Sequence, residues 1–302
     1  MSLAPWLREL RLPFLAASIL PVLLGGSLVF AATGTVDLVL FLLTLAAMVC
    51  LHLGANVANE YFDFRSGTDV VNTQRTPFSG GTGLLPTGQL KPVSVHRLSL
   101  AFFAAGSLIG LSLVALRGLP VLVLGLVGLV SGYCYTAPQL NFARRGLGEL
   151  LVGFNFGVLP VLGTVLVLTG ALSLPAVLAS LPLAFLITAV LYVNQFPDYE
   201  ADKQAGKRHL VVRLGRARAV RGYELLLVGA YLSLGLAIAV GALPLLAGLT
   251  FLTLPLAGKA ARNLRAHHST FPAIIPSNAL TVLAHLAAGI ILAVTVAVAP
   301  LW

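Results

Sequence analysis

Two short stretches of the sequence gather side chains that could bind a metal ion. In the first, GANVANEYFDFRSGTD, the side chains of Asn59, Glu60 and Asp63 follow Asn56 by three, four and seven residues. Residues at these intervals share one face of a helix. We therefore expect a helix that presents these four side chains together, with Asp69 in the turn that follows.

The second stretch, YVNQFPDYEADKQAGKRH, places Asn194, Asp198 and Asp202 at intervals of four residues, again on one helical face. Pro197 removes one backbone hydrogen bond and loosens the helix just before the first acid. Carboxylates packed together repel one another, so they need either protons or a bound cation. The ligands are hard oxygens, and no His or Cys stands at matching spacing, which favours Mg²⁺ over zinc.

Basic residues interleave with these acids. Mg²⁺ is typically held by a few carboxylates together with substrate phosphates. Cations beside such carboxylates suit a polyanion such as diphosphate. The pattern thus predicts a site for Mg²⁺ and a diphosphate, with the following candidate phosphate-binding residues: Arg65, Arg75, Lys203, Lys207 and Arg208.

The surrounding chain is that of a membrane protein. Of its 302 residues 58% are apolar and only 10% are charged, with ten Asp and Glu in all. Soluble domains carry roughly 25% charged residues. We therefore expect an all-α, polytopic bundle that forms one domain over residues 1–302. The two cysteines, Cys50 and Cys134, lie in apolar runs, which excludes a disulfide framework and a Cys-based metal site.

A membrane span needs about 20 mostly apolar residues. On this criterion we predict nine spans, at approximately 13–32, 37–58, 97–116, 119–137, 147–169, 173–196, 222–241, 243–258 and 274–299.

Placing the spans on alternate sides puts eighteen of the 19 Lys and Arg residues on one side and only Arg117 on the other. Basic loops stay in the cytoplasm. The N-terminus and the acidic motifs are therefore expected on the cytoplasmic side of the cell (inner) membrane. The net charge of +9 then orients the chain in the lipid bilayer and does not indicate nucleic-acid binding. The predicted cytoplasmic cap loops lie near 59–96, 138–146, 197–221 and 259–273.

These motifs resemble those of the UbiA superfamily of membrane prenyltransferases. The first motif of that family reads N-D-x-x-D-x-x-x-D and the second D-x-x-x-D. Here they correspond to the stretch from Asn59 to Asp69 and to Asp198-Tyr-Glu-Ala-Asp202. YCYTAP at 133–138 and GKRHLVVRLG at 206–215 are also similar to the family, and further details resemble its 1,4-dihydroxy-2-naphthoate branch.

The resemblance implies a reaction and roles for the residues. Two Mg²⁺ ions would bridge the carboxylates and the diphosphate of a polyprenyl donor, and an allylic carbocation would be attacked by an aromatic quinone precursor. The implied ligands of one ion are Asn59, Glu60, Asp63 and Asp69, and those of the other are Asp198 and Asp202, with Asn194 nearby. Aromatic faces stabilise cations, and the candidates here are Tyr135, Tyr61 and Phe62.

The sequence departs from the family pattern in places that concern the acceptor. Position 60 is Glu where the family usually has Asp. In QRTPFSGGTG, Arg75 and Pro77 match the naphthoate branch, but a second arginine is missing. Alternative acceptors are therefore 4-hydroxybenzoate, homogentisate or a lipid alcohol. An ion-coupled transporter is the alternative from another class, although transporters usually place their acids at the bilayer midplane. We interpret SGGTG at 79–83 as a lid over the donor site.

Overall fold

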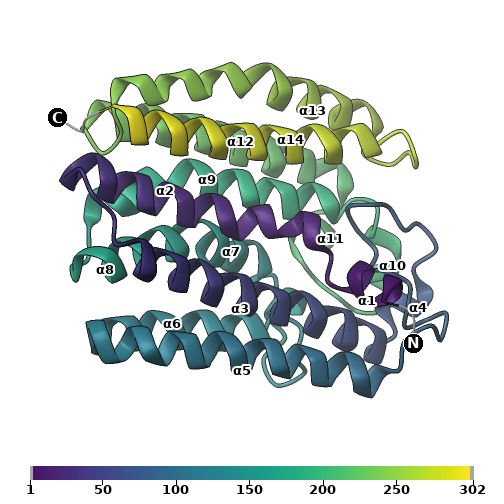
Figure 1. The fold of residues 1–302 in the computed structure, drawn as a ribbon. Coiled ribbons are helices and arrows are strands. Elements are labelled where there is room, and N and C mark those ends of the chain that lie inside the picture. The colour runs from purple at the N-terminus through teal and green to yellow at the C-terminus, as the bar shows by residue number, and fades with distance from the viewer. Residues whose placement is uncertain (1–2, 300–302) are drawn as a thin grey trace.

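Long helices form an antiparallel bundle in this computed structural model, which describes residues 3–299 and contains no strand within them (Figure 1). The all-α prediction is thereby confirmed. Within the described residues, seven helical segments are long and apolar enough to cross a membrane. They are Ala4–Thr33 (which includes α2, Ala16–Thr33), α3 (Leu38–Arg65), α5 (Pro92–Arg117), Gly148–Thr169, α9 (Leu174–Asn194), α12 (Arg216–Ala239) and α14 (Ile275–Val298). Segment Gly148–Thr169 consists of α7 (Gly148–Gly153), a π-helical turn η3 (Phe154–Val158) and α8 (Leu159–Thr169).

The other two predicted spans correspond to shorter elements. The fourth is α6 (Leu119–Tyr133), which has only 15 residues, and the eighth is the 3₁₀ segment η4 (Leu245–Thr253) followed by α13 (Leu254–His267). The count of nine spans stays a prediction.

Most of the predicted loop 259–273 is helical, because α13 extends to His267. The helix buries Ala257, Ala260 and Leu264, which lie at intervals of three and four residues, and it exposes the charged residues between them. The prediction of a loop from residue 259 is therefore wrong in this part. The fall in hydropathy marks an amphipathic helix and not the end of a helix.

The short elements gather at one end of the bundle, where α3 and α9 finish (Figure 1). We call this end the motif end. Its elements are α1 (Ala4–Glu9), η1 (Leu12–Leu15), α4 (Thr68–Val71), η2 (Phe142–Arg145), α10 (Tyr199–Gln204) and α11 (Leu210–Leu214). The predicted loops 59–96, 138–146 and 197–221 thus contain α4, η2, α10 and α11 in addition to the ends of long helices, whereas α1 and η1 precede α2.

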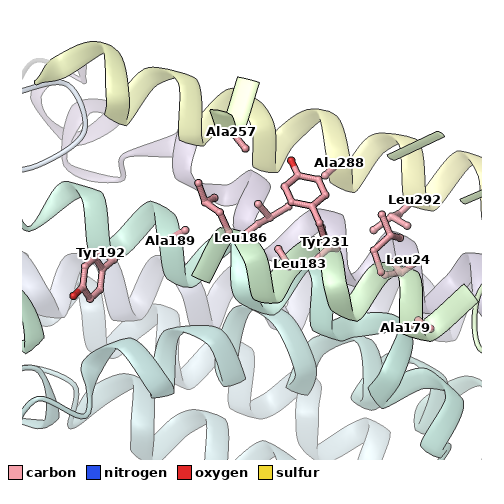
Figure 2. Packing of buried hydrophobic residues seen from close by; sticks show 14 of the residues in the cluster. Leu24, Ala179, Leu183, Leu186, Ala189, Tyr192, Tyr231, Ala257, Ala288 and Leu292 are labelled. Atoms are coloured by element: carbon pink, nitrogen blue, oxygen red, sulfur yellow. The ribbon is translucent and has the colours of Figure 1, made fainter. Parts of the chain in front are cut away.

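Helix α9 forms the centre of the bundle. Of its apolar window 72% is buried, against 22% for α5. Figure 2 shows Leu183 of α9 packed with Leu24 of α2, Tyr231 of α12 and Leu292 of α14. Because α9 is enclosed by its neighbours, the second acidic motif begins at the end of the most firmly held helix.

Two glycines allow η3 to approach α9 closely. A Cβ atom on Gly153 would lie 2.4 Å from Oγ1 of Thr188, and one on Gly157 would lie 2.4 Å from Cα and Cβ of Ala184. Glycines four residues apart permit such close contact between membrane helices.

Arg117, the exception to the charge asymmetry, ends α5 on the side away from the motifs. Its Nε donates to the carbonyl oxygen of Val167 (2.6 Å) and its Nη2 to that of Leu168 (3.4 Å). The last carbonyl groups of a helix have no partner within the helix. Arg117 therefore caps the C-terminal end of α8.

Substituting Gly157 by alanine should lower the melting temperature of the purified protein in detergent. Overpacking a tight contact costs about 1–3 kcal/mol, and the backbone of Ala184 has to move to admit the methyl group. Gly163→Ala, in α8, is the matched control because nothing lies within 4 Å of the added Cβ atom. A loss of stability in the control as large as that in Gly157→Ala would contradict this account.

Candidate active site at the motif end

The first acidic motif lies at the end of α3, as predicted. The helix continues to Arg65, and Gly67 adopts a left-handed conformation (φ 83°) that favours glycine and lets the chain turn. Asp69 follows on α4, and both Asp63 and Asp69 are buried. The break at Gly67 thereby brings two acids of one motif to the same place from two helices.

The second motif is interrupted at Pro197. Helix α9 ends at Asn194 and α10 begins at Tyr199, so the predicted continuous helical face does not exist. The backbone N–H of Asp202 nevertheless donates to the carbonyl oxygen of Asp198 (2.8 Å). The two acids therefore stay one turn apart although the helix is interrupted before them.

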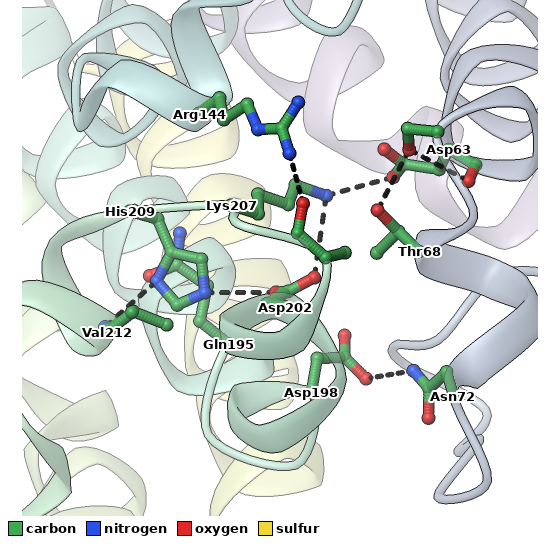
Figure 3. Close-up of polar contacts among 12 residues, drawn as sticks. Asp63, Thr68, Asn72, Arg144, Gln195, Asp198, Asp202, Lys207, His209 and Val212 are labelled. Atoms are coloured by element: carbon green, nitrogen blue, oxygen red, sulfur yellow. Dashed lines mark hydrogen bonds and ion pairs between the residues drawn. The ribbon is translucent and has the colours of Figure 1, made fainter.

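Lys207 connects the two motifs (Figure 3). Its Nζ donates to Oδ2 of Asp63 at 2.9 Å and lies 3.9 Å from Oδ1 of Asp202. Burial opposes the charge of Lys207, but these two carboxylates raise its pKa well above the ordinary value. One ammonium group thus holds carboxylates from two distant parts of the chain together.

Two residues that the sequence analysis missed fix the second motif. His209 Nε2 lies 3.0 Å from Oδ2 of Asp202, and Asn72 Nδ2 donates to Oδ1 of Asp198 at 2.9 Å. Burial raises the pKa of Asp202, but Lys207 and His209 outweigh it and the net shift is downward. His209 adjoins the GKR sequence and could have been noticed there, whereas nothing near Asn72 in the sequence points to its role.

The two remaining acids carry raised pKa values. Burial, followed by the negative charges of Asp63 and Glu60, raises the pKa of Asp69 to about 9. Burial and the charge of Asp202 raise the pKa of Asp198 to about 7. These carboxyl groups are therefore ready to exchange a proton for another cation.

The loop 79–83 lies against the first motif. Gly80, Gly81 and Gly83 all have positive φ, and a Cβ atom on Gly81 would lie 2.8 Å from Oδ2 of Asp69. Arg75 holds this loop, since its Nη2 donates to the carbonyl oxygen of Asp69 (2.5 Å) and its Nε to that of Gly80 (3.2 Å). Arg75 is thus engaged with the backbone. That the loop acts as a lid stays a prediction.

Glu60 points away from the other acids of its motif. Its Oε1 accepts from Arg11 Nη1 (3.2 Å), and its Oε2 accepts from the backbone N–H (2.8 Å) and hydroxyl (3.0 Å) of Thr82. The same hydroxyl group lies 2.9 Å from Oε2 of Glu9, which is fully buried. Glu60 therefore joins α3 to the loop and to the N-terminal helix, and it does not line the cavity described next.

A cavity of about 580 Å³ runs from the motifs into the apolar interior. Its mouth is lined by the four aspartates of the motifs, by Asn56, Asn59, Asn72 and Asn194, and by Lys207 and Tyr135. Its deeper part is lined by apolar residues of α5, α6 and α8, among them Leu111, Val114, Val121 and Val167.

Several predicted residues do not reach this cavity. The side chains of Arg65, Lys203 and Arg208 are exposed and do not line it. Tyr61 and Phe62 pack instead with His96, whose ring stacks on Tyr61 at 4.4 Å. Of the predicted aromatic residues, Tyr135 alone lies on the cavity wall.

Comparison with known proteins agrees with this architecture. The profile of the UbiA prenyltransferase family matches residues 18–273. The chain belongs to the UbiA prenyltransferase family. Over 206 residues it is 33% identical to the 1,4-dihydroxy-2-naphthoate octaprenyltransferase of Bacillus subtilis (strain 168), an alignment that covers 68% of this chain but only 64% of that protein. It is 29% identical over 272 residues to the UbiA prenyltransferase domain-containing protein 1 of Xenopus tropicalis, covering 89% of this chain and 74% of that protein.

Solved UbiA structures share the fold. The apo structure of a UbiA homolog from Aeropyrum pernix K1 has a TM-score of 0.70 at 20% identity and covers 92% of this chain and 97% of that one. A UbiA homolog from Archaeoglobus fulgidus bound to GPP and Mg²⁺ has a TM-score of 0.59 at 17% identity, with 96% and 99% covered. The UbiA fold predicted from the two motifs is thereby confirmed.

The residues of this UbiA protein fit a magnesium ion. Among residues 3–299 no three His, Cys, Asp or Glu side chains form a cluster that could hold a metal by themselves. Mg²⁺ commonly takes one or two carboxylates and completes its shell with phosphate oxygens and water. The paired acids of each motif suit that pattern, and Asn59 Oδ1 is a buried oxygen without a hydrogen-bond partner.

Binding of Mg²⁺ to the protein should strengthen as the pH rises from about 6 to about 9, because Asp198 and Asp69 titrate near 7 and 9 without metal. A metal must displace these protons, so its apparent affinity should rise by up to about tenfold per pH unit for each proton released. Calorimetric titration in buffers of different ionisation enthalpy measures both the affinity for Mg²⁺ and the number of protons released on binding. In the Asp198→Asn variant, the rise in Mg²⁺ affinity near pH 7 should vanish. A pH-independent affinity without proton release would refute the prediction.

Proposed function

We propose that this protein transfers an isoprenyl group from a polyprenyl diphosphate to an aromatic acceptor, with Mg²⁺ as cofactor. The observation that carries the proposal is the arrangement of the cavity, in which two acidic motifs face one another at the mouth of an apolar space. A diphosphate needs cations and polar ligands, whereas an isoprenoid tail needs apolar walls. A single cavity supplies both.

The donor diphosphate would lie at the motif end. Asn59, Asp63 and Asp69 would hold one Mg²⁺ ion, and Asp198 and Asp202 would hold a second. Glu60 is left out of this set because its oxygens already accept hydrogen bonds from Arg11 and Thr82. When bound, the metal would neutralise the charge that develops on the diphosphate as the allylic C–O bond breaks.

The protein's own groups would assist this step in three ways. Lys207, which now faces Asp63, would donate to the departing diphosphate. Asn72 and His209 keep the carboxylates of Asp198 and Asp202 in place through their hydrogen bonds. The ring of Tyr135 lies on the cavity wall next to the motifs, where its face would stabilise an allylic cation.

For the acceptor we propose 1,4-dihydroxy-2-naphthoate. The support is the name of the Bacillus subtilis relative, together with the sequence details that resemble that branch. The reaction would then belong to menaquinone biosynthesis, and the acceptor would lose its carboxylate in the course of it. The cluster of basic residues at the motif end supports a plasma-membrane protein whose site faces the cytoplasm.

Asp63→Asn and Asp198→Asn should each lower the rate of prenyl transfer by at least about 100-fold, because each removes a carboxylate that would hold the Mg²⁺ ion that neutralises the leaving diphosphate. The assay measures prenylated product by mass with purified protein, a polyprenyl diphosphate and 1,4-dihydroxy-2-naphthoate. Glu200→Gln is the control, since Glu200 is exposed and pairs with Arg216 outside the cavity.

Full activity of either aspartate variant would disprove the assignment of the site. If the wild-type protein released no diphosphate from the donor with any aromatic acceptor but carried H⁺ or Na⁺ across liposome membranes, the transporter hypothesis would replace this one.

A further inference from the structure

The cavity has a second polar region that neither the metal nor the diphosphate uses. It is formed by η1 and the residue before it, by α3 and by η3. Its residues are Arg11, Phe14, His52, Asn56 and Phe156, all of which line the cavity. We call this region the η1–α3 wall.

Arg11 is the charged residue of this wall. Among the described residues, Arg11 and Lys207 are the only Lys or Arg side chains that line the cavity. Lys207 is committed to the aspartates, whereas Arg11 lies over the ring of Phe14, at 4.3 Å from its centroid. A guanidinium group has five N–H donors, and Arg11 uses two of them, toward Glu60 and the carbonyl oxygen of Phe78. The others are free to bind an anion.

The backbone of Arg11 is held in an unusual conformation. Arg11 has φ 49°, in the left-handed region, which non-glycine residues enter at an energetic cost. The residue lies at the junction of α1 and η1, and this conformation ends α1 there. The fold therefore fixes Arg11 at the cavity mouth.

His52 and Asn56 lie on the same wall, four residues apart on α3. His52 is only 4% exposed, and its Nδ1 lies 2.5 Å from Oγ of Ser18. Asn56 Nδ2 is buried and has no hydrogen-bond partner. A buried polar group without a partner is costly, so Asn56 points to a ligand with polar atoms of its own.

The composition of the wall suits an aromatic ring system with polar groups. Phe14 lies beside the guanidinium group of Arg11, and the ring centroid of Phe156 lies 4.5 Å from that of His52. Both polar ends of the wall therefore have an aromatic side chain next to them. The opposite walls, from α5, α6 and α8, are apolar and remain for the isoprenoid tail.

We propose that the η1–α3 wall binds the acceptor, with Arg11 pairing with its carboxylate and His52 and Asn56 bonding a ring hydroxyl. This inference rests on the proposed function and adds to it the residues that hold the acceptor. A lipid alcohol has no group for Arg11, so the arginine selects against it. Arg11 is a specificity-determining residue in this account, and Glu60 positions it.

The test compares two acceptors that share a ring, 1,4-dihydroxy-2-naphthoate and naphthalene-1,4-diol, which lacks the carboxylate. Arg11→Gln should raise the KM for the carboxylated acceptor about 10- to 100-fold, as expected for loss of a hydrogen-bonded charge pair. The KM for the diol and the KM for the donor should change less than about twofold, because neither ligand contacts Arg11 through a carboxylate.

Three further variants make the result specific. Arg8→Gln is the matched control, since Arg8 is exposed one turn earlier and does not line the cavity. Arg11→Lys keeps the charge beside Glu60, so it should retain part of the preference for the carboxylated acceptor. Unchanged KM values for the diol and the donor in Arg11→Gln show that this variant is folded. His52→Leu should weaken both acceptors equally, because both carry the ring hydroxyl.

Equal loss for the two acceptors in Arg11→Gln, or no loss for either, would overturn the inference. Calorimetric binding of both acceptors, in the presence of Mg²⁺ and a thio-diphosphate donor analogue that does not react, separates it from the proposed function. If wild type binds the naphthoate selectively through Arg11 but forms no product, the reaction is wrong and the site stands. If wild type binds neither acceptor, the inference fails.

Discussion

The ammonium group of Lys207 is the contact on which the rest of the site depends. It neutralises Asp63 at the end of α3 and approaches Asp202 on α10, in a place where burial opposes every charge. Without a cation there, carboxylates from the two motifs would face one another in a medium of low dielectric constant, where like charges repel strongly. The lysine between the two motifs thus offsets the repulsion between Asp63 and Asp202.

Interrupted helices deliver these groups to the lysine. Gly67 follows the end of α3 and allows Asp69 to return toward Asp63, and the break at Pro197 separates α10 from α9. Helix α9 is firmly packed, with 72% of its apolar segment buried, whereas the corresponding segment of α3 is only 28% buried. The second motif therefore follows a rigid support, and the loop 79–83 lies against the first motif.

Local chemistry made the larger part of this arrangement predictable. The spacing of Asn59 and Asp63 required a helix, and Gly67 and Pro197 are residues at which helices stop or bend. The partner of each charged group was not predictable, because it is chosen by contacts between distant segments. Of the five basic residues predicted to bind phosphate, only Lys207 lines the cavity. Glu60 pairs with Arg11, which lies 49 residues earlier in the chain. Nothing in the sequence near Asn72 predicts its contact with Asp198. The predicted span ended at residue 258, before the end of α13, because the charged residues of this helix resemble those of a loop.

Arg117 has a consequence for how the protein is made. Its guanidinium group is bound by carbonyl oxygens of α8, which follow it by 50 and 51 residues. When α5 enters the membrane these carbonyls have not been synthesised, so the long side chain must reach water at the interface instead. Arg117 therefore finds its partner only after α8 has been made. On the orientation that we predict from the sequence, the other basic residues would orient the chain as it inserts. Biogenesis would then separate in time the charges that set the orientation from the one that fastens two helices together.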